Sequence, residues 1–594
     1  LQGVTAQDNF DLIDEAGGRY LALVRSFAVQ ASGGEGIDLE LVNESSSFNG
    51  RAMLSAIELV RVNPGGGADA AVDLAFSNDG GSNYTAVAGG LPMNRFGQGN
   101  YQWTAGPETV GDSGLLQVTA TSGTLPSDES DDGFVVTNAG TAYYINDSVL
   151  TDDEYTTALG NNANSGKTSD QPMASIAALL RAYDLDPGDV IYVDTGDYVL
   201  PVNLVIGVED AGVTIQGPVT GLNEAVLNRP NTATGSYVFQ LENADGVTLS
   251  NLTVVGGEYG VLAGSSSDSD DVELRELEVL NARSYGVYLN SGNDSASLVD
   301  LEVHDNGSFG AYLLGNETLV QGGEYYTNGS NGVTLSGSNW LVEGAEVYGN
   351  TTGISGGGAG TVRGNLVRDN SSVGISGGTN VVIEGNTVFG QRGANDVGIQ
   401  GSGGTVRGNL VYDNFYGVTG SGLIEGNRIF ANLGSGVRTS GARVIGNAIY
   451  SNPIGVQQLS NFSGARLTLT NNLIYENTNQ AVTINWGADS TLTNNTIYQS
   501  VGDALTVTGS ARNVTVQNNI LWVDLGTILV VAANSQVGFA SDDNLFYRGP
   551  ADDAVVAQWG TDTYATLGLW QAAPEQQDGR SLSGEPQLFD IDGC

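Results

Sequence analysis

Eight asparagines recur in the second half of the chain at intervals of 18 to 25 residues. They are Asn365, Asn386, Asn409, Asn427, Asn447, Asn472, Asn495 and Asn519. Each lies in a near-copy of one phrase, Gly/Asn-Asn-x-Val/Ile-aromatic, as at residues 408–412. A fixed period of this length indicates a solenoid whose units bury their apolar sides against their neighbours. Buried amides at one corner can hydrogen-bond from coil to coil, so the phrase predicts a parallel β-helix.

The repeat sets the expected size of this all-β structure. Equivalent phrase positions without the asparagine fall at residues 252, 277, 301, 323 and 345, which gives about thirteen coils or more of roughly 22 residues each. At a strand spacing of about 4.8 Å, thirteen coils would form a rod on the order of 60 Å long.

The composition excludes several classes of partner. The chain has 67 acidic and 21 basic residues, for a net charge of −46, which disfavours nucleic acid and anionic membranes. This acidity suits a salty or calcium-containing medium, or reflects solubility in general. No apolar run is long enough to span a membrane, so we expect no transmembrane segment. The single cysteine, Cys594, cannot form a disulfide within the chain.

Two strand-rich segments precede the repeat. Residues 25–29 and 54–59 resemble the C-terminal half of malectin-like carbohydrate-binding domains, which implies a partial β-sandwich over 1–63. Another chain or upstream sequence would complete that sandwich. Residues 64–137 resemble immunoglobulin-type or fibronectin-type spacers, with strands expected at 72–76, 101–104 and 115–120. The chain starts without a signal-peptide pattern, so we expect a processed protein or part of a longer one.

The entry and exit of the repeat carry a further resemblance. The order of motifs at 160–198 resembles the N-terminal entry of secreted right-handed parallel β-helix (pectin-lyase-like) proteins, and residues 559–589 resemble their exit. Ile176, Leu179, Leu180 and Tyr183 share one face of a short predicted helix that would cover the open end. The resulting prediction is an entry and cap over 138–200, the β-helix over 201–548 and an exit segment over 549–594.

A column of charges lies two residues before the asparagines. It contains Glu343, Arg363, Glu384, Arg407 and Glu425, whose signs alternate from coil to coil. We expect a structural network that fixes the strand register, with each charge facing opposite charges on both sides. The alternative is an Arg–Glu pair for proton abstraction in a lyase, which the regular alternation disfavours.

Aromatic side chains are the candidates for carbohydrate contact, since flat rings suit the apolar faces of sugars. Tyr348 and Tyr412 belong to an aromatic column three residues after the phrase position, for which packing is the alternative. Tyr288 and Tyr312 belong to a solvent-facing column that follows a repeated glycine, and Trp340 lies in the same early coils.

Catalytic and metal candidates are sparse. His304 is the single histidine, and Asp305 and Arg283 would be its helpers if it acted as a base, although a surface role fits better. Asp268, Asp270 and Asp271 form an acidic loop that could bind Ca²⁺, but it matches no known calcium loop, so solvated charge is favoured.

Three functions remain open at this stage. The leading prediction is an extracellular or cell-surface adhesive protein, built as a rigid rod with carbohydrate contact. The alternative is a polysaccharide lyase or hydrolase, for which no complete acid–base set emerges. The third is a filament subunit that self-associates or packs on neighbouring domains, its first domain completed by another chain.

Overall fold

The structure is a computed structural model that describes residues 71–93, 98–101, 103, 111–121, 126–131, 133–136, 141–220, 224–459, 465–549 and 555–586. Tertiary contacts divide the chain into two units, Leu1–Asn138 and Ala139–Cys594. The malectin-like segment predicted at 1–63 lies outside the described residues.

The first unit contains a small antiparallel sheet. Its strands are β1 (Ala71–Ser77), β2 (Thr85–Pro92), β3 (Gly111–Ala120), β4 (Ser127–Glu129) and β5 (Phe134–Val136). β1 lies between β2 and β3, and Phe76 on β1 is buried against the rings of Trp103 and Phe134. Residues 101 and 103 are not in a strand, in contrast to the prediction for 101–104. The likeness to an immunoglobulin-type spacer stays a prediction.

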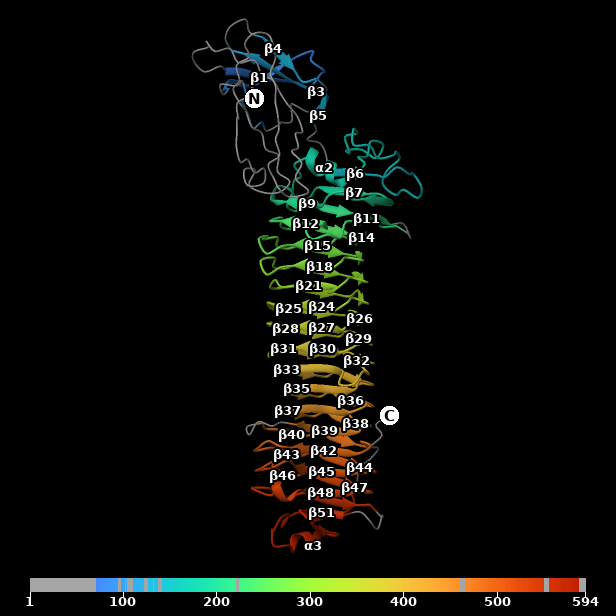
Figure 1. Ribbon diagram of the computed structural model, residues 1–594, viewed down its shortest axis with the longest axis vertical. Coiled ribbons are helices and arrows are strands. Elements are labelled where there is room, and N and C mark those ends of the chain that lie inside the picture. Colours follow the sequence, from blue (N-terminus) through green and yellow to red (C-terminus); the bar gives the residue numbers. More distant parts are fainter. Residues whose placement is uncertain are drawn as a thin grey trace, which may run out of the picture. The chain divides into compact units, whose positions relative to one another are not determined.

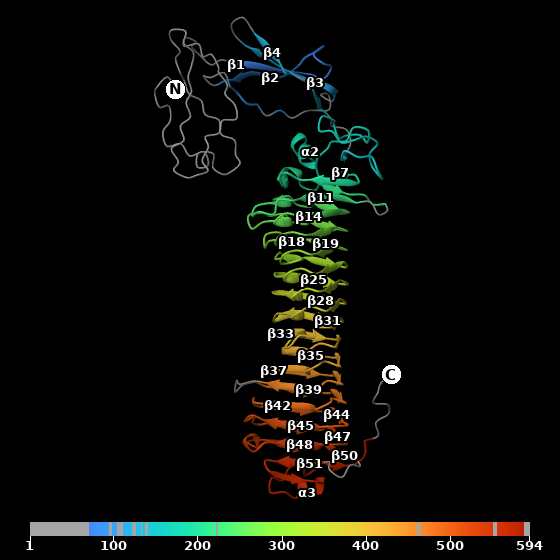
Figure 2. The same cartoon turned by 45° about the vertical axis from the view of Figure 1, so that its right-hand side comes forward.

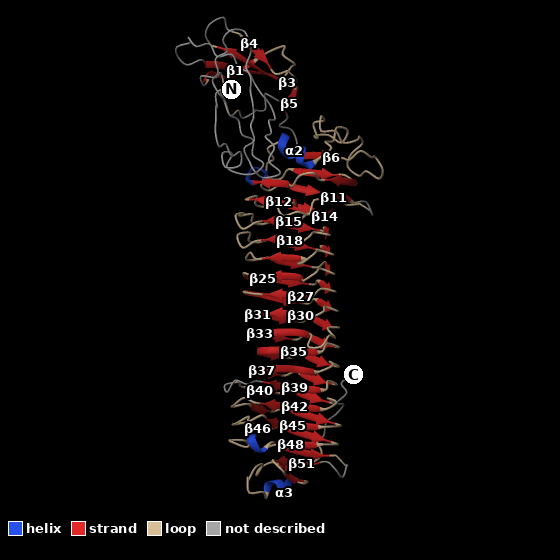
Figure 3. Cartoon of the chain, viewed as in Figure 1, coloured by secondary structure: helices blue, strands red, loops and turns tan. Residues whose placement is uncertain are grey.

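The second unit is a parallel β-helix, as the repeat predicts. Figures 1 and 2 show its coils stacked from β7 to β51, and Figure 3 shows that strands dominate each coil. Every coil contributes one strand to each of three faces, which we call A, B and C in chain order. β6 (Ala142–Ile145) pairs in parallel with the first strand of face A. Neither described helix approaches the length needed to cross a membrane.

The strands of the three faces have the following bounds. Face A contains β7 (Val190–Val193), β10 (Thr214–Gln216), β13 (Thr248–Ser250), β16 (Glu273–Arg275), β19 (Ser297–Val299), β22 (Leu319–Gln321), β25 (Ser338–Glu343), β28 (Ala359–Arg363), β31 (Asn380–Glu384), β40 (Thr468–Thr470), β43 (Thr491–Thr493), β46 (Thr515–Gln517) and β49 (Ala540–Asp542). Face B contains β8 (Gly196–Val199), β11 (Ala225–Arg229), β14 (Leu252–Gly256), β17 (Glu278–Leu280), β20 (Glu302–His304), β23 (Glu324–Tyr326), β26 (Glu346–Tyr348), β29 (Leu366–Arg368), β32 (Thr387–Phe389), β34 (Leu410–Tyr412), β36 (Arg428–Phe430), β38 (Ala448–Tyr450), β41 (Leu473–Tyr475), β44 (Thr496–Gln499), β47 (Ile520–Val523), β50 (Leu545–Arg548) and β53 (Leu582–Ser583). Face C contains β9 (Leu204–Gly207), β12 (Tyr237–Glu242), β15 (Tyr259–Ala263), β18 (Tyr285–Leu289), β21 (Ala311–Leu313), β24 (Asn331–Leu335), β27 (Thr352–Gly356), β30 (Val373–Gly377), β39 (Ile454–Leu459), β42 (Gln480–Asn485), β45 (Asp503–Thr508), β48 (Thr527–Val531) and β51 (Val555–Trp559), the last paired with the antiparallel β52 (Asp562–Tyr564).

Three long strands turn the corner from face C to face A without a break. They are β33 (Val397–Arg407), β35 (Tyr416–Glu425) and β37 (Ser435–Ile445). Because they belong to both faces, they join A and C into one continuous sheet.

The register keeps equivalent residues in file. On face B, Val367, Val388 and Val411 pair in sequence, and each is fully buried, because alternate strand residues point inward. Face B has four strands more than the thirteen expected phrases, namely β8, β11, β50 and β53. The prediction of thirteen coils or more is therefore a minimum.

Short helices lie at both ends of the stack. α2 (Ile176–Ala182) begins after the N-cap Ser175 and buries Ile176 and Leu179 in the core, as the sequence predicts. At the other end, α3 (Leu567–Gln571) buries Leu567 and Trp570. The 3₁₀ turns η2 (Val208–Asp210) and η3 (Ala533–Ser535) lie near the two ends. These segments cover apolar edges that would otherwise face water.

Candidate functional site

A ladder of buried asparagines runs along the corner between faces A and B. The eight asparagines of the repeated phrase and one further residue, Asn544, are at most 2% exposed. In each coil the side-chain Nδ2 donates to the Oδ1 of the next coil's asparagine, at 2.9–3.0 Å. The last donor, Asn544, reaches the buried carboxylate of Asp578 at 3.2 Å. All of these bonds therefore point the same way along the stack.

The residue before each ladder asparagine explains the Gly/Asn-Asn phrase. From Gly364 to Asp543 this residue has φ between 56° and 64°. Glycine and asparagine tolerate this left-handed conformation better than other residues do. The first residue of the phrase thus turns the corner, and the second fills it.

A second amide ladder, which the sequence reasoning missed, runs along the corner between faces B and C. Its members are Asn306, Asn328, Asn350, Asn370, Gln391, Asn414, Asn432, Asn452, Asn477 and Gln499. The repeated glycine at or just before the start of the face C strands from β18 to β39 makes room for it. A Cβ added to Gly353 would lie 2.9 Å from Asn370 Nδ2 and 2.6 Å from a backbone oxygen. Both corners are therefore filled by structural amides.

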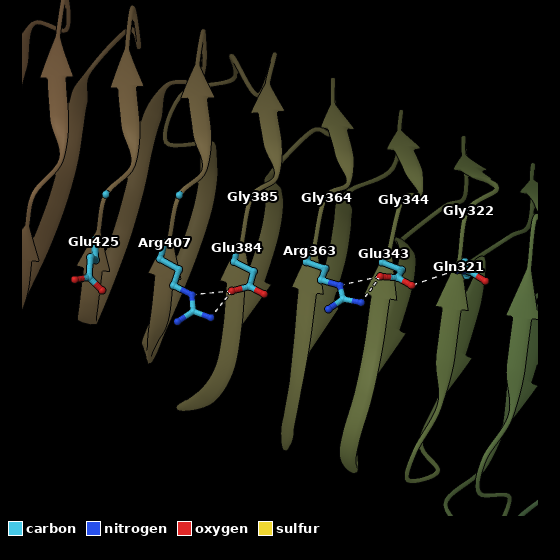
Figure 4. A pocket seen from close by; sticks show the side chains of 12 residues that line it. Gln321, Gly322, Glu343, Gly344, Arg363, Gly364, Glu384, Gly385, Arg407 and Glu425 are labelled. Carbon is cyan, nitrogen blue, oxygen red and sulfur yellow. Dashed lines mark hydrogen bonds and ion pairs between the residues drawn. The ribbon is translucent and has the colours of Figure 1, made fainter.

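The charge column lines a shallow groove on face A (Figure 4). Arg363 Nε donates to Glu343 at 2.8 Å, and Arg407 Nε donates to Glu384 at 2.7 Å. Within the described residues, no ion pair joins Arg363 to Glu384 or Arg407 to Glu425. The expected continuous network is thus wrong in detail, because each arginine leans toward one neighbour only. The arrangement is two separate pairs, with Glu425 in register beside the second.

These exposed pairs should contribute little to stability. In a double-mutant cycle of Glu343→Gln and Arg363→Gln, we expect a coupling below about 1 kcal/mol that shrinks with added salt, since both side chains contact water. Urea unfolding of the four proteins measures it. A salt-independent coupling above about 3 kcal/mol would instead indicate a desolvated functional pair.

An aromatic column follows the outer side of face B. His304, Tyr326 and Tyr348 stack with ring centroids 4.6 and 4.9 Å apart, and Arg368 lies over the Tyr348 ring. The stack resumes from Phe389 through Tyr412 to Phe430, Tyr450 and Tyr475, with centroids 4.7–5.2 Å apart. Neighbouring side chains therefore cover the ring faces of Tyr348 and Tyr412, and mainly the ring edges face solvent.

Tyrosines also cluster on the outer side of face C in its first coils. Tyr288 and Tyr312 stack at 5.5 Å, and Tyr285 packs edge-on against both. Tyr259 stacks on Tyr285 at 5.1 Å, and burial together with Glu258 raises the pKa of Tyr259 to about 12. The Tyr259 phenol thus remains a neutral hydrogen-bonding group at the surface.

Trp340 does not belong to this cluster, so its assignment as a carbohydrate contact is wrong. It is 1% exposed, and its Nε1 donates to the Gly357 carbonyl at 2.8 Å. The indole fills the space left by glycines in the next coil: a Cβ added to Gly360 would lie 2.1 Å from the ring. Gly356 and Gly360 in the next coil therefore leave enough space for the large ring to be buried in the core.

His304 lies on face B among carboxylates. Its Nδ1 is 2.9 Å from Asp305, and its Nε2 is 3.1 Å from Glu278 of the preceding coil. Burial lowers the pKa of His304, but the bonds to Asp305 and Glu278 outweigh it and hold the pKa above its usual value. Arg283 contacts Glu258 and Thr234 instead, so the structure joins His304 to Asp305 but not to Arg283.

The acidic loop does not form the calcium site considered from the sequence. Asp270 accepts a hydrogen bond from the Asp294 backbone N–H of the next coil at 2.7 Å. Within the described residues, three potential metal ligands converge at Glu278, Glu302 and His304 alone. The carboxylates of Asp268, Asp270 and Asp271 do not converge in this way.

The sequence model of the family described as "Right handed beta helix region" matches residues 237–388, 357–521 and 421–564, together more than half of the chain. The chain belongs to this family. In this right-handed β-helix protein, the matched region contains both amide ladders, the charge column and His304. No protein among those with curated descriptions has significant sequence similarity to it.

Several solved structures resemble this β-helix protein at low sequence identity. Pectate lyase Pel9A is 17% identical, with 60% of this chain and 78% of that chain covered and a TM-score of 0.28. A tailspike protein of the E. coli bacteriophage HK620 is 13% identical, with 61% and 73% covered and a TM-score of 0.35. The A-module of a mannuronan C-5 epimerase from Azotobacter vinelandii is 14% identical, with 67% and 92% covered and a TM-score of 0.26. Likenesses at this level do not choose between an enzyme and a structural protein.

Proposed function

We propose that the protein is a rigid extracellular or cell-surface rod that contacts carbohydrate. The observation that carries this proposal is the pair of buried amide ladders, which bond coil to coil along most of the stack. Each ladder amide is satisfied by its neighbours and by backbone carbonyls, as Asn409 is by Ile383, Arg407 and Asn427. A stack bonded in this way resists bending and holds surface side chains at fixed spacing.

The tyrosine cluster of face C is the surface best suited to a sugar. Tyr288 and Tyr312 are partly exposed and lie in register on adjacent strands. Tyr288 and Tyr312 stack on each other and Phe309 stacks on Tyr312, so a sugar would contact the exposed ring edges, and the phenol oxygens can hydrogen-bond to its hydroxyls. The net charge of −46 favours neutral glycans over uronate polymers. We therefore expect a neutral polysaccharide as the ligand class.

Binding to a panel of immobilised neutral and acidic glycans tests this proposal. The double variant Tyr288→Ala/Tyr312→Ala should bind the best neutral glycan at least about fivefold more weakly, since each lost ring contact costs on the order of 0.5–1.5 kcal/mol. The matched control is Phe389→Ala on face B, which should bind as the parent does.

Two results would count against this assignment. Loss of binding in Tyr412→Ala with retention in the face C variant would move the site to face B. The absence of binding to every glycan on the panel would remove carbohydrate contact from the proposal. Electron microscopy should then still show rods, either isolated or, for a filament subunit, in periodic arrays.

One observation favours the enzymatic alternative, a polysaccharide lyase or hydrolase. His304 is bonded to Asp305 and Glu278, an arrangement that could hold a base. The early-coil cluster expected from the sequence does not converge, however, because Trp340 is in the core and Tyr288 lies on a different face from His304. Unsaturated or shortened products from the glycan panel, lost in His304→Ala, would establish the enzyme.

A further inference from the structure

Four glutamates are the first residues of four adjacent strands of face B. Glu278, Glu302, Glu324 and Glu346 pair in register on the adjacent strands β17, β20, β23 and β26. Like charges directly opposite each other on neighbouring strands destabilise a sheet. At the far end of the file, Arg368 donates to Glu346 at 2.8 Å and offsets that charge. The near end lacks an arginine or lysine within ion-pair distance among the described residues.

His304 lies beside the near end of this file, two residues after Glu302 on β20. Its side chain is 10% exposed, and its Nε2 lies 3.1 Å from Glu278 Oε1 and 4.0 Å from Glu302 Oε1. These three atoms come from two successive coils and lie within 4.8 Å of one another. One imidazole nitrogen and two carboxylate oxygens therefore converge on one point at the surface of face B.

Neighbouring groups hold each of the three side chains in place. Asp305 accepts from Nδ1 at 2.9 Å and so orients the ring with Nε2 toward Glu278, where a bound ion would replace the proton that Nε2 donates. The Tyr326 ring stacks on the imidazole at 4.6 Å, and its hydroxyl donates to Glu302 at 2.6 Å. Thr253 donates to the second oxygen of Glu278 at 3.2 Å. A carboxylate behind a histidine and hydrogen bonds behind ligating carboxylates are typical of metal sites.

The spacing suits a small transition-metal ion. Zn²⁺ binds histidine nitrogen at about 2.0–2.1 Å and carboxylate oxygen at about 2.0–2.2 Å, so tetrahedral ligand atoms lie roughly 3.3–3.5 Å apart. The observed separations of 3.1 and 4.0 Å bracket this value. A nitrogen ligand also favours zinc and its neighbours over Ca²⁺ and Mg²⁺, which prefer oxygen alone.

We propose that Glu278, Glu302 and His304 form a binding site for one divalent transition-metal ion, with Zn²⁺ as the representative ion. The ion would neutralise two stacked carboxylates and tie the coil of β17 to the coil of β20. Three protein ligands leave a fourth position for water. Bound metal should stabilise these two coils, because it binds the folded stack and not the unfolded chain.

The test is titration of the full chain with Zn²⁺ after chelator treatment, in excess Mg²⁺ to occupy weak acidic sites. Competition with a chromophoric chelator should reveal one tight equivalent per chain. His304→Ala and, separately, Glu278→Gln should each weaken that equivalent at least about thirtyfold. The matched control is Glu324→Gln, which lies next in the same file but outside the ligand set and should bind within about twofold of the parent.

A second readout separates a coordinated ion from diffuse attraction to an acidic protein. Co²⁺ bound through His304 should give visible d–d absorption that disappears in His304→Ala, whose fold is checked by circular dichroism. The proposal is overturned if Zn²⁺ shows no tight equivalent. It is equally overturned if Glu278→Gln and His304→Ala, still folded, bind as well as Glu324→Gln does.

Discussion

Replacing Asn409 by leucine is expected to lower the free energy of unfolding by about 3–5 kcal/mol. The amide accepts from the backbone N–H and Nδ2 of Asn386 and donates to Ile383, Arg407 and Asn427. Leucine has the same branched shape but cannot hydrogen-bond, so it leaves these partners buried and unpaired, each at a cost of about 1–3 kcal/mol before relaxation. Urea unfolding of the full chain measures the loss.

The damage should also be local, because each coil of a solenoid contacts its neighbours alone. Hydrogen exchange followed by mass spectrometry should show faster exchange in peptides around residues 383–427, with little change near residue 500. The matched control is Asn380→Ala. This asparagine is exposed on face A in the coil before that of Asn409, and its replacement should shift stability by less than about 0.5 kcal/mol. Equal effects of the two substitutions would contradict a structural role for the ladder.

Truncation of Trp340 to alanine should be comparably severe, at about 3–5 kcal/mol. The indole is buried over Gly356 and Gly360, so its removal leaves a cavity that neighbouring side chains are too short to fill. Replacement of Gly360 by valine should destabilise by the opposite route, overpacking, since even a Cβ there meets the ring at 2.1 Å. Thermal and urea unfolding measure both.

A matched tryptophan is available for comparison. Trp486 is 49% exposed, and Trp486→Ala should cost less than about 1 kcal/mol. If Trp340→Ala lowered the free energy of unfolding no more than Trp486→Ala does, the buried position of Trp340 would be contradicted. The prediction from the sequence that Trp340 contacts carbohydrate would then be favoured.

The fold could be predicted from the sequence because one corner of every coil needs two unusual residues together. A residue with left-handed backbone must be followed by a buried amide, and this requirement produces the Gly/Asn-Asn motif in each coil from Asn365 to Asn519. The second ladder was invisible because its left-handed positions are held by varied residues, such as Thr327, Ala431 and Glu476. Tertiary packing imposes the left-handed conformation at these positions, so no recurring sequence motif marks them.

The candidate site was predictable only where its parts are neighbours in sequence. His304 and Asp305 are adjacent, and their contact follows directly. Glu278 comes 26 residues earlier, and its position beneath His304 depends on the lengths of the intervening loops. Trp340 was misplaced because its burial depends on the glycines of the next coil, a long-range fit that strand alternation alone does not reveal.

The first amide ladder also gives the rod an electrical direction. Its side-chain dipoles are aligned with their positive ends toward the C-terminus, where the Asp578 side chain accepts hydrogen bonds from Asn544, Ser541, Ser581 and Trp570. The two ends of the column are therefore not equivalent. Because the ladder begins at Asn365, inside the stack, and Asp578 accepts its last donor, the column is closed within one chain and needs no neighbouring rod to complete it.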